Sequence, residues 1–196
     1  MAEENLKEKA LGLTYKYRAE ADLFFQGNPE YSKTDKWPKP PKKSPEIVQR
    51  IMQVAKKYKI SPQLLISPAL TEFLGKEFGL LLNEIMIENH GSLFIQSRTH
   101  QKIKVSSNLA LEVDSPCGAY ICSLDEKTIL AVTAKTPLLA AAGSQIILPY
   151  LKTDEIDLVE IKSLVKKHAG EIIGTLILKD QEINAIGGLC IGPNAG

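Results

Sequence analysis

The spacing of the apolar residues changes near Gly91, and this change constrains the fold more than any other feature of the sequence. Before Gly91, apolar residues recur every three or four positions, as they do on one face of a helix. After Gly91 they form short runs separated by turn residues, which is typical of strands. We therefore expect an α+β (mixed α/β) protein with a helical N-terminal region. Because 44% of the residues are hydrophobic and 24% are charged, the chain is globular and not disordered or collagenous.

The N-terminal region, residues 1–90, is predicted to hold helices on either side of an extended arm. An amphipathic helix ends at Gly27, a second covers residues 47–58, and a third covers residues 73–86 before the Asn89-His90-Gly91 stop. On this third helix Glu72 and the later glutamates are expected to form a solvated face. Residues 29–44 are rich in proline and lysine, which predicts an extended arm.

The C-terminal region, residues 91–196, is predicted to be a second, mixed α/β domain. Its first part is an antiparallel meander, and its second part is a strand–helix–strand unit that completes a mixed sheet. In that unit residues 145–151 and 172–178 are the strands, and residues 153–169 form a helix capped by Thr153. Earlier strands are predicted at 93–96, 102–105, 108–113, 119–123 and 128–132, followed by a short helix at 138–142, and a last strand at 183–191 is broken by glycines.

The charge and the cysteine content limit which classes of function and which cellular compartment we expect. The net charge of +1 gives no overall electrostatic reason to expect binding to nucleic acid or to an anionic membrane. Residues 1–60 are basic, however, with thirteen Lys or Arg against eight Asp or Glu. The three cysteines lack metal-ligand spacing, and their odd number favours a reducing compartment. With no apolar signal or membrane-spanning run, we expect a cytoplasmic protein without a metal or a cofactor.

Two candidate chemistries were weighed against structural explanations. Cys117 follows a turn and could be a nucleophile with a distant histidine, for which His90 is a candidate. Buried cysteine is also a common core residue, and this interpretation is favoured. Gly187, Gly188 and Gly192 could let backbone amides approach a phosphate. Because no helix follows them, a simple glycine-rich tail is favoured.

Two further features concern partners. Residues 45–75 have a faint helix-turn-helix spacing, so nucleic-acid binding is possible but not favoured. Trp37 lies among lysines and prolines with no local core to join, which favours burial at an interface between copies of the chain. We therefore expect a homo-oligomer.

These features lead to three functional hypotheses. The favoured one is a non-enzymatic regulatory, ligand-binding or assembly module of unknown ligand. The alternatives are a small cysteine-dependent enzyme that uses Cys117 and a nucleic-acid-binding regulator that uses residues 45–75.

Overall fold

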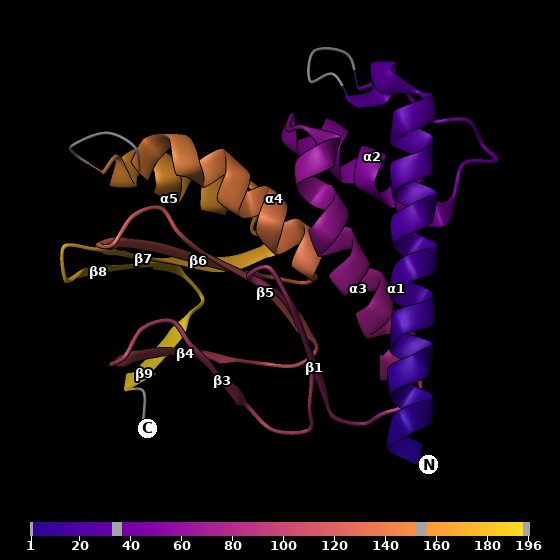
Figure 1. Ribbon diagram of the computed structural model, residues 1–196. Helices are drawn as coiled ribbons and strands as arrows, with labels where there is room; N and C mark the ends of the chain where they lie inside the picture. Colours follow the sequence, from indigo (N-terminus) through magenta and orange to yellow (C-terminus); the bar gives the residue numbers. More distant parts are fainter. Residues whose placement is uncertain (1, 33–36, 152–155, 194–196) are drawn as a thin grey trace.

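The computed structural model describes residues 2–32, 37–151 and 156–193. It confirms an α+β fold in which a helical N-terminal region precedes antiparallel sheets with interspersed helices (Figure 1). The longer helices are α1 (Ala2–Gly27), α2 (Glu46–Tyr58), α3 (Ile66–Gly79), α4 (Pro137–Ile147) and α5 (Leu158–Lys167). The strands are β1 (Ile85–Asn89), β2 (Ser92–Gln96), β3 (Gln101–Lys104), β4 (Leu109–Val113), β5 (Cys117–Ser123), β6 (Thr128–Ala134), β7 (Ile172–Lys179), β8 (Glu182–Gly187) and β9 (Cys190–Pro193).

The strands form two sheets that pack against each other. The large sheet has the order β1-β2-β5-β6-β7-β8, and the small sheet has the order β3-β4-β9. In Figure 1, α4 and α5 lie on one face of the large sheet, and the small sheet lies on the other. Buried apolar side chains such as Ile95, Leu111 and Leu176 fill the space between the sheets.

The main core joins the N-terminal helices to the helix-covered face of the large sheet. Ile47 and Ile51 of α2 belong to the same buried cluster as Leu138 of α4, Ile161 of α5 and Leu130 of β6. The helical period of the N-terminal sequence is therefore explained by burial against later parts of the chain. The division into two domains at residue 90 stays a prediction, and buried side chains from both sides of that residue share this core.

The helix predicted for residues 73–86 is wrong beyond Gly79. α3 ends there, and β1 pairs with β2 as an antiparallel hairpin. Leu80 and Leu81 are 86% and 54% exposed, so they do not continue the buried face of α3. His90 and Gly91 have φ angles of 50° and 78°, which suit a tight hairpin turn better than a helix end.

The predicted strand–helix–strand unit is also wrong. Residues 145–151 are not a strand, because α4 runs to Ile147 and a 3₁₀ turn (Leu148–Leu151) follows. Gly143 does not end the helix: a side chain there would meet Ile172 and Val132, so glycine allows close packing on the sheet. α5 begins at Leu158, where the Asp157 side chain accepts a hydrogen bond from the amide of Glu160. The predicted cap, Thr153, lies outside the described residues.

Without that first strand there is no parallel crossover. β7 is antiparallel to both of its neighbours, β6 and β8, and every strand pair in the described chain is antiparallel. The sheet is therefore not mixed. The five strands predicted between residues 93 and 132 are present, but β2 pairs with β5 because β3 and β4 leave for the small sheet. The glycines in residues 183–191 separate β8 from β9, which lie in different sheets.

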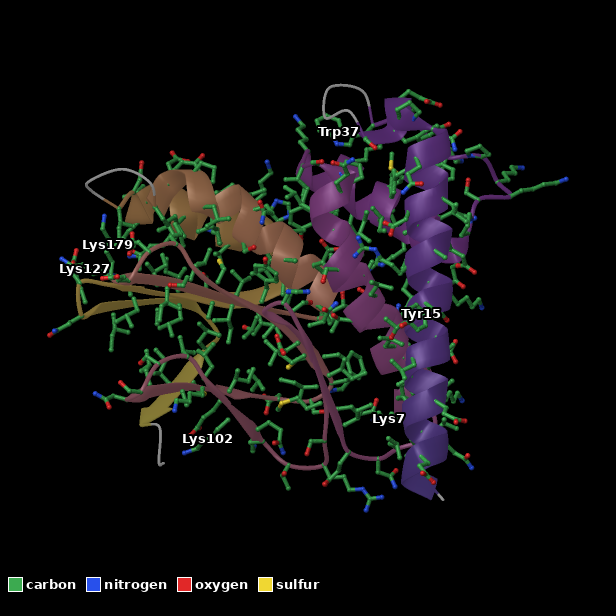
Figure 2. The ribbon with its side chains drawn as sticks, viewed as in Figure 1. Lys7, Tyr15, Trp37, Lys102, Lys127 and Lys179 are labelled. Carbon is green, nitrogen blue, oxygen red and sulfur yellow. The ribbon has the colours of Figure 1, made fainter. Side chains whose placement is uncertain are left out.

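The arm predicted at residues 29–44 is not extended throughout, because Pro29–Ser32 form a 3₁₀ turn. Its described part from residue 37 packs on its own chain. Its Trp37 indole nitrogen donates a hydrogen bond to the carbonyl of Ile60 at 2.9 Å, and the ring packs against the main core. Figure 2 shows Trp37 at the helical end of the molecule, far from Lys102 on the small sheet. The premise that Trp37 has no core to join is therefore wrong, whereas the homo-oligomer stays a prediction.

Candidate functional site

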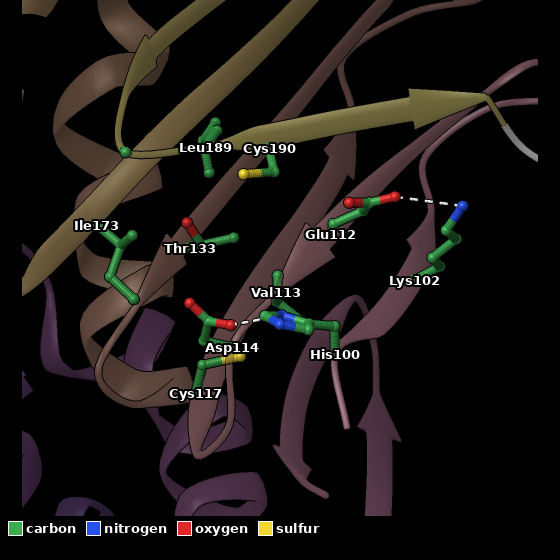
Figure 3. Close-up of a pocket in the computed structure, with 11 residues that line it drawn as sticks. His100, Lys102, Glu112, Val113, Asp114, Cys117, Thr133, Ile173, Leu189 and Cys190 are labelled. Atoms are coloured by element: carbon green, nitrogen blue, oxygen red, sulfur yellow. Dashed lines mark ion pairs between the residues drawn. The ribbon is translucent and has the colours of Figure 1, made fainter. Parts of the chain in front are cut away.

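A cavity of about 280 Å³ lies between the two sheets (Figure 3). Its walls come from segments that are far apart in the sequence. β3 and β4 contribute Lys102, Glu112 and Val113, and the large sheet contributes Thr133 and Ile173. The connection from β8 to β9 contributes Gly188, Leu189 and Cys190, while His100, Asp114 and Cys117 complete the lining.

The β3–β4 hairpin places two ion pairs at this cavity. The antiparallel register sets Lys102 opposite Glu112, and Lys102 Nζ lies 3.2 Å from Glu112 Oε1. One step beyond each strand, His100 Nδ1 lies 2.6 Å from Asp114 Oδ1. The His100 and Asp114 side chains are 81% and 83% exposed, so this pair is in contact with solvent and contributes little to stability. The hairpin therefore presents donors and acceptors at the rim of the cavity.

The Cys117 thiol is at the buried end of the site. Cys117 is 2% exposed, and burial, together with the negative charge of Asp114, raises its pKa to about 11. The thiol is thus protonated at neutral pH, which is the reverse of what a nucleophilic cysteine requires. Cys190, in contrast, is exposed on β9. All three cysteines are free thiols.

The structure brings some of the predicted site residues together and separates others. Cys117 and Gly188 line the cavity, and Gly187 precedes Gly188 with a φ of 92°. Gly192 lies on β9, where a side chain would meet Glu112 Oε1 at 2.9 Å, so glycine permits close approach of β9 to β4. His90 lies in the β1–β2 turn and is not part of the cavity wall.

His100 lines the cavity and is not among the site residues expected from the sequence. In the structure the β3–β4 hairpin turns over residues 106–108, so its register is centred on Ser107, sets Lys102 opposite Glu112 and brings His100 near Asp114. The two-residue turn between the strands predicted at 102–105 and 108–113 would instead set Lys102 opposite Leu111. The predicted strands therefore do not reveal these two charge pairs, because a shift of one residue in register changes every partner.

No metal site is found in the part of the chain that the structure describes. There, no three His, Cys, Asp or Glu side chains are close enough to hold an ion together. His100 and Asp114, together with two thiols, line the cavity without forming such a set.

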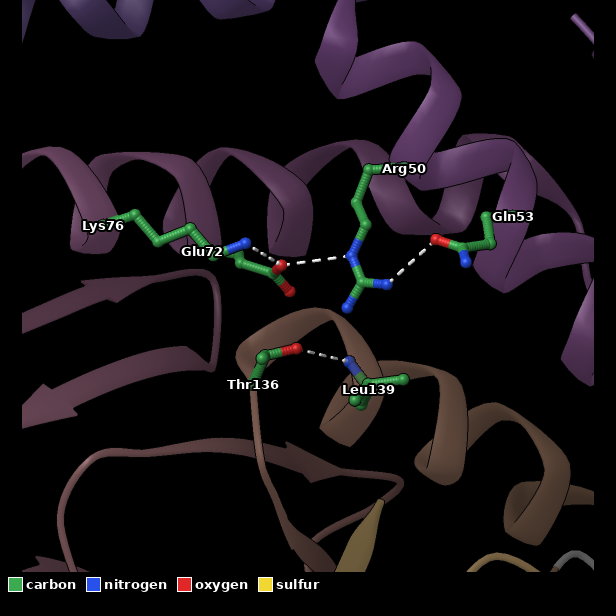
Figure 4. Close-up of polar contacts among 6 residues, drawn as sticks. All are labelled: Arg50, Gln53, Glu72, Lys76, Thr136 and Leu139. Carbon is green, nitrogen blue, oxygen red and sulfur yellow. Dashed lines mark hydrogen bonds and ion pairs between the residues drawn. The ribbon is translucent and has the colours of Figure 1, made fainter. Parts of the chain in front are cut away.

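A second polar cluster surrounds Glu72 between the helices (Figure 4). Glu72 has no exposed surface, so the prediction that it lies on a solvated face is wrong. Its Oε1 lies 3.1 Å from Arg50 Nε and 2.7 Å from Lys76 Nζ. Burial alone raises the pKa of this carboxyl, but the hydrogen bond from Lys76, the nearby Thr136 hydroxyl and the positive charge of Arg50 outweigh it, and the net pKa is lowered. The cluster connects α2, α3 and the start of α4.

The burial of α3 bears on the helix-turn-helix hypothesis. A recognition helix must offer one face to a DNA groove. In α3, the buried residues include Leu70, Glu72, Phe73 and Leu74, and the helix packs on α1, α4, β1 and β2. The structure therefore offers no support for α3 as a reader of base edges.

Among the described residues, no helix is both long and apolar enough to cross a lipid bilayer. Comparison of the chain with models of known protein families finds no match, and comparison with curated proteins finds none either.

Proposed function

We propose that this chain is a ligand-binding module without catalytic activity and that its site is the cavity between the two sheets. The observation that carries the proposal is the convergence of the β3–β4 hairpin, the β8–β9 connection and the large sheet on one cavity of about 280 Å³. This volume is at the lower end of the range for small-molecule sites. The ligand is therefore a small molecule.

The lining indicates the chemistry of that ligand. The cavity is lined by the apolar side chains of Val113, Ile173 and Leu189 and by the polar side chains of Lys102 and Glu112. Because the Lys102 charge is paired with that of Glu112, the wall has no excess of either sign at this point. Such a site suits a small neutral or zwitterionic molecule with an apolar part, oriented by a few hydrogen bonds.

The raised pKa of Cys117 favours binding over covalent catalysis. A nucleophilic thiol is activated by a positive neighbour or a base, whereas burial and Asp114 hold this thiol in its neutral form. The enzyme hypothesis therefore lacks its central requirement in this geometry. The cysteine is better explained as part of the apolar packing between the sheets.

The exposed thiol of Cys190 provides the test. A maleimide attached to it adds bulk at the cavity wall, while Cys190→Ser cannot be modified and serves as the matched control. The probe is a set of small neutral and zwitterionic compounds, which includes amino acids and simple amides, and binding is followed by amide chemical shifts of the labelled protein.

We expect compounds that bind to shift the amides of residues 101–104, 109–113 and 188–190. Maleimide treatment should abolish these shifts in the parent protein and leave them intact in Cys190→Ser. Shifts that lie elsewhere, or that survive modification of Cys190, would contradict the proposal. No response to any compound of the set would contradict the assigned ligand class.

A further inference from the structure

A second concave site lies at the opposite end of the molecule, between the arm and α2. We name it the arm groove; it has a volume of about 900 Å³ and is bounded by residues 38–42 of the arm and by the outer face of α2. Glu46, Gln49, Arg50, Gln53 and Lys56 line it at helical spacing. None of these residues belongs to the cavity between the sheets.

Hydrogen bonds fix the arm to the rest of the chain at both ends of this groove, so the fold itself holds the wall of the groove in place. At one end, the Trp37 indole donates to the carbonyl of Ile60 just beyond α2. At the other end, Gln49 Nε2 donates to the carbonyls of Lys42 and Ser44, at 3.3 and 2.7 Å. Prolines 38 and 40 between the two anchors restrict the backbone further. A ligand would therefore meet a preorganised wall, which lowers the entropy cost of binding.

The groove is strongly cationic. Lys39 and Lys42 line it from the arm and Lys56 from α2, and all three are exposed. In the described chain, none of the three has a carboxylate within 4.0 Å. Arg50 adds a fourth positive charge at the base of the groove, although its Nε is engaged by Glu72. Glu46 is the one acidic residue in the described lining, so a net positive charge faces the groove.

The remaining lining residues favour one class of anionic partner over another. Pro38 and Pro40, both half-buried, give the groove an apolar surface beside its charges. Single-stranded nucleic acid normally requires aromatic side chains on which bases stack. No aromatic side chain is found among the described residues of the groove, and the Trp37 ring packs on the core. A peptide, in contrast, can use both kinds of surface, with carboxylates on the lysines and apolar side chains on the prolines.

We propose that the arm groove binds an extended acidic peptide segment of a partner protein that carries both acidic and apolar residues. Lysines on both walls of the groove pair with its carboxylates, and Pro38 and Pro40 of the arm offer the surface on which its apolar side chains pack. The charge contribution is solvent-exposed, so the affinity falls as salt is added.

The test uses the full chain and fluorescence anisotropy of short labelled ligands. One peptide alternates Glu and Leu, and a second alternates Glu and Ser at the same length and charge. A short oligothymidylate with the same number of negative charges is the third ligand. The groove variant is Lys39→Gln/Lys42→Gln/Lys56→Gln. The control is Lys104→Gln/Lys162→Gln/Lys166→Gln, which removes three exposed charges elsewhere and has the same net charge. Thermal melting verifies that both variants fold.

We expect the Glu-Leu peptide to bind more tightly than the Glu-Ser peptide. The groove variant should weaken its binding by about tenfold, and the control by less than about twofold. Equal loss in both variants would show that only the net charge acts and would overturn the proposal. Tighter binding of the oligothymidylate, with the same dependence on the three groove lysines, would overturn it in favour of a nucleic-acid site. No binding of the Glu-Leu peptide at low salt would also refute it.

Discussion

Gly187 at the end of β8 and Gly188 directly after it allow a direct test of the backbone geometry that forms the cavity, because alanine should be tolerated at one position and not at the other. Gly187 has a φ of 92°, a conformation that residues with side chains rarely adopt. A Cβ atom there would lie 2.5 Å from the carbonyl oxygen of Ile173 and 2.8 Å from Gly174 Cα, both in the neighbouring strand β7. Because these are backbone atoms of a buried sheet, they cannot rotate away. Gly187→Ala must therefore distort β8, β7 or both.

The expected cost has two parts. Holding alanine at this φ costs roughly 1–3 kcal/mol, and relieving the backbone contact costs a similar amount. The two costs are not fully additive, because one shift of the backbone can relieve both the strained φ angle and the close contact. We therefore expect a total loss of about 3 kcal/mol in the free energy of unfolding. For a domain of this size, that loss lowers the melting temperature by roughly 6–12 °C.

Gly188 is the matched control because it is next in the chain and lines the cavity. A Cβ atom at this position would lie 3.9 Å from the carbonyl oxygen of Ile173, which is an ordinary contact. Gly188→Ala should change the stability by less than about 0.5 kcal/mol. Denaturant unfolding of both variants, followed by circular dichroism, measures the difference. If Gly187→Ala is as stable as Gly188→Ala, the close approach of β8 to β7 and the resulting path of the chain into β9 are wrong.

Three further predictions concern Glu72, the cysteines and the oligomeric state of the chain. Because the pKa of Glu72 is lower in the folded state than in the unfolded chain, its ionisation stabilises the fold above about pH 4.3, and this contribution is lost as the pH falls through the folded pKa. The free energy of unfolding of the parent should therefore fall more steeply below about pH 5 than that of Glu72→Gln; parallel curves would contradict this assignment. A thiol-alkylating reagent should modify exposed Cys190 first and buried Cys117 only after unfolding, and peptide mass mapping that finds the reverse order would refute the assigned burial. Finally, light scattering should give the full chain a dimeric mass at micromolar concentration, and a monomeric mass would refute the predicted homo-oligomer. Since Trp37 packs on its own chain, a Trp37→Ala variant that remains dimeric would show that the contact between copies does not require this residue.

The sequence predicts local structure well where one period holds through a whole element. Tyr17 and Ala21 of α1 are buried, as their spacing predicts, but the same spacing continues to Phe24 in the sequence, whereas Phe25 is the residue that is buried. Prediction of local structure from the sequence fails where the apolar runs are short. Residues 145–151 have the composition of a strand, but Ile147 and Leu151 are four residues apart and are both buried when the chain continues as helical turns. That outcome depends on packing against a sheet that no local pattern reveals.

The cavity itself could not be predicted from the sequence for the same reason. Cys117 and Gly188 were singled out separately, each by residue type, and both line it. These two residues line the same cavity because β9 pairs with β4 and does not continue beside β8. The choice between those two neighbours is made by long-range strand pairing. In the sequence that choice is marked only by Gly187 at the end of β8 and Gly188 directly after it.

The position of β9 has a consequence for the order of assembly and for access to the interior. β4 can pair with β3 as soon as the hairpin forms, but its other edge must wait for residues 190–193, which follow all the strands of the large sheet. This pairing closes a long loop and is expected late in folding. β9 is also a short edge strand with hydrogen bonds to one neighbour, so it can detach without unfolding β5, β6 or β7. Its backbone amides should exchange with solvent well before those of β6, and each such opening would expose the space between the sheets to a molecule arriving from outside.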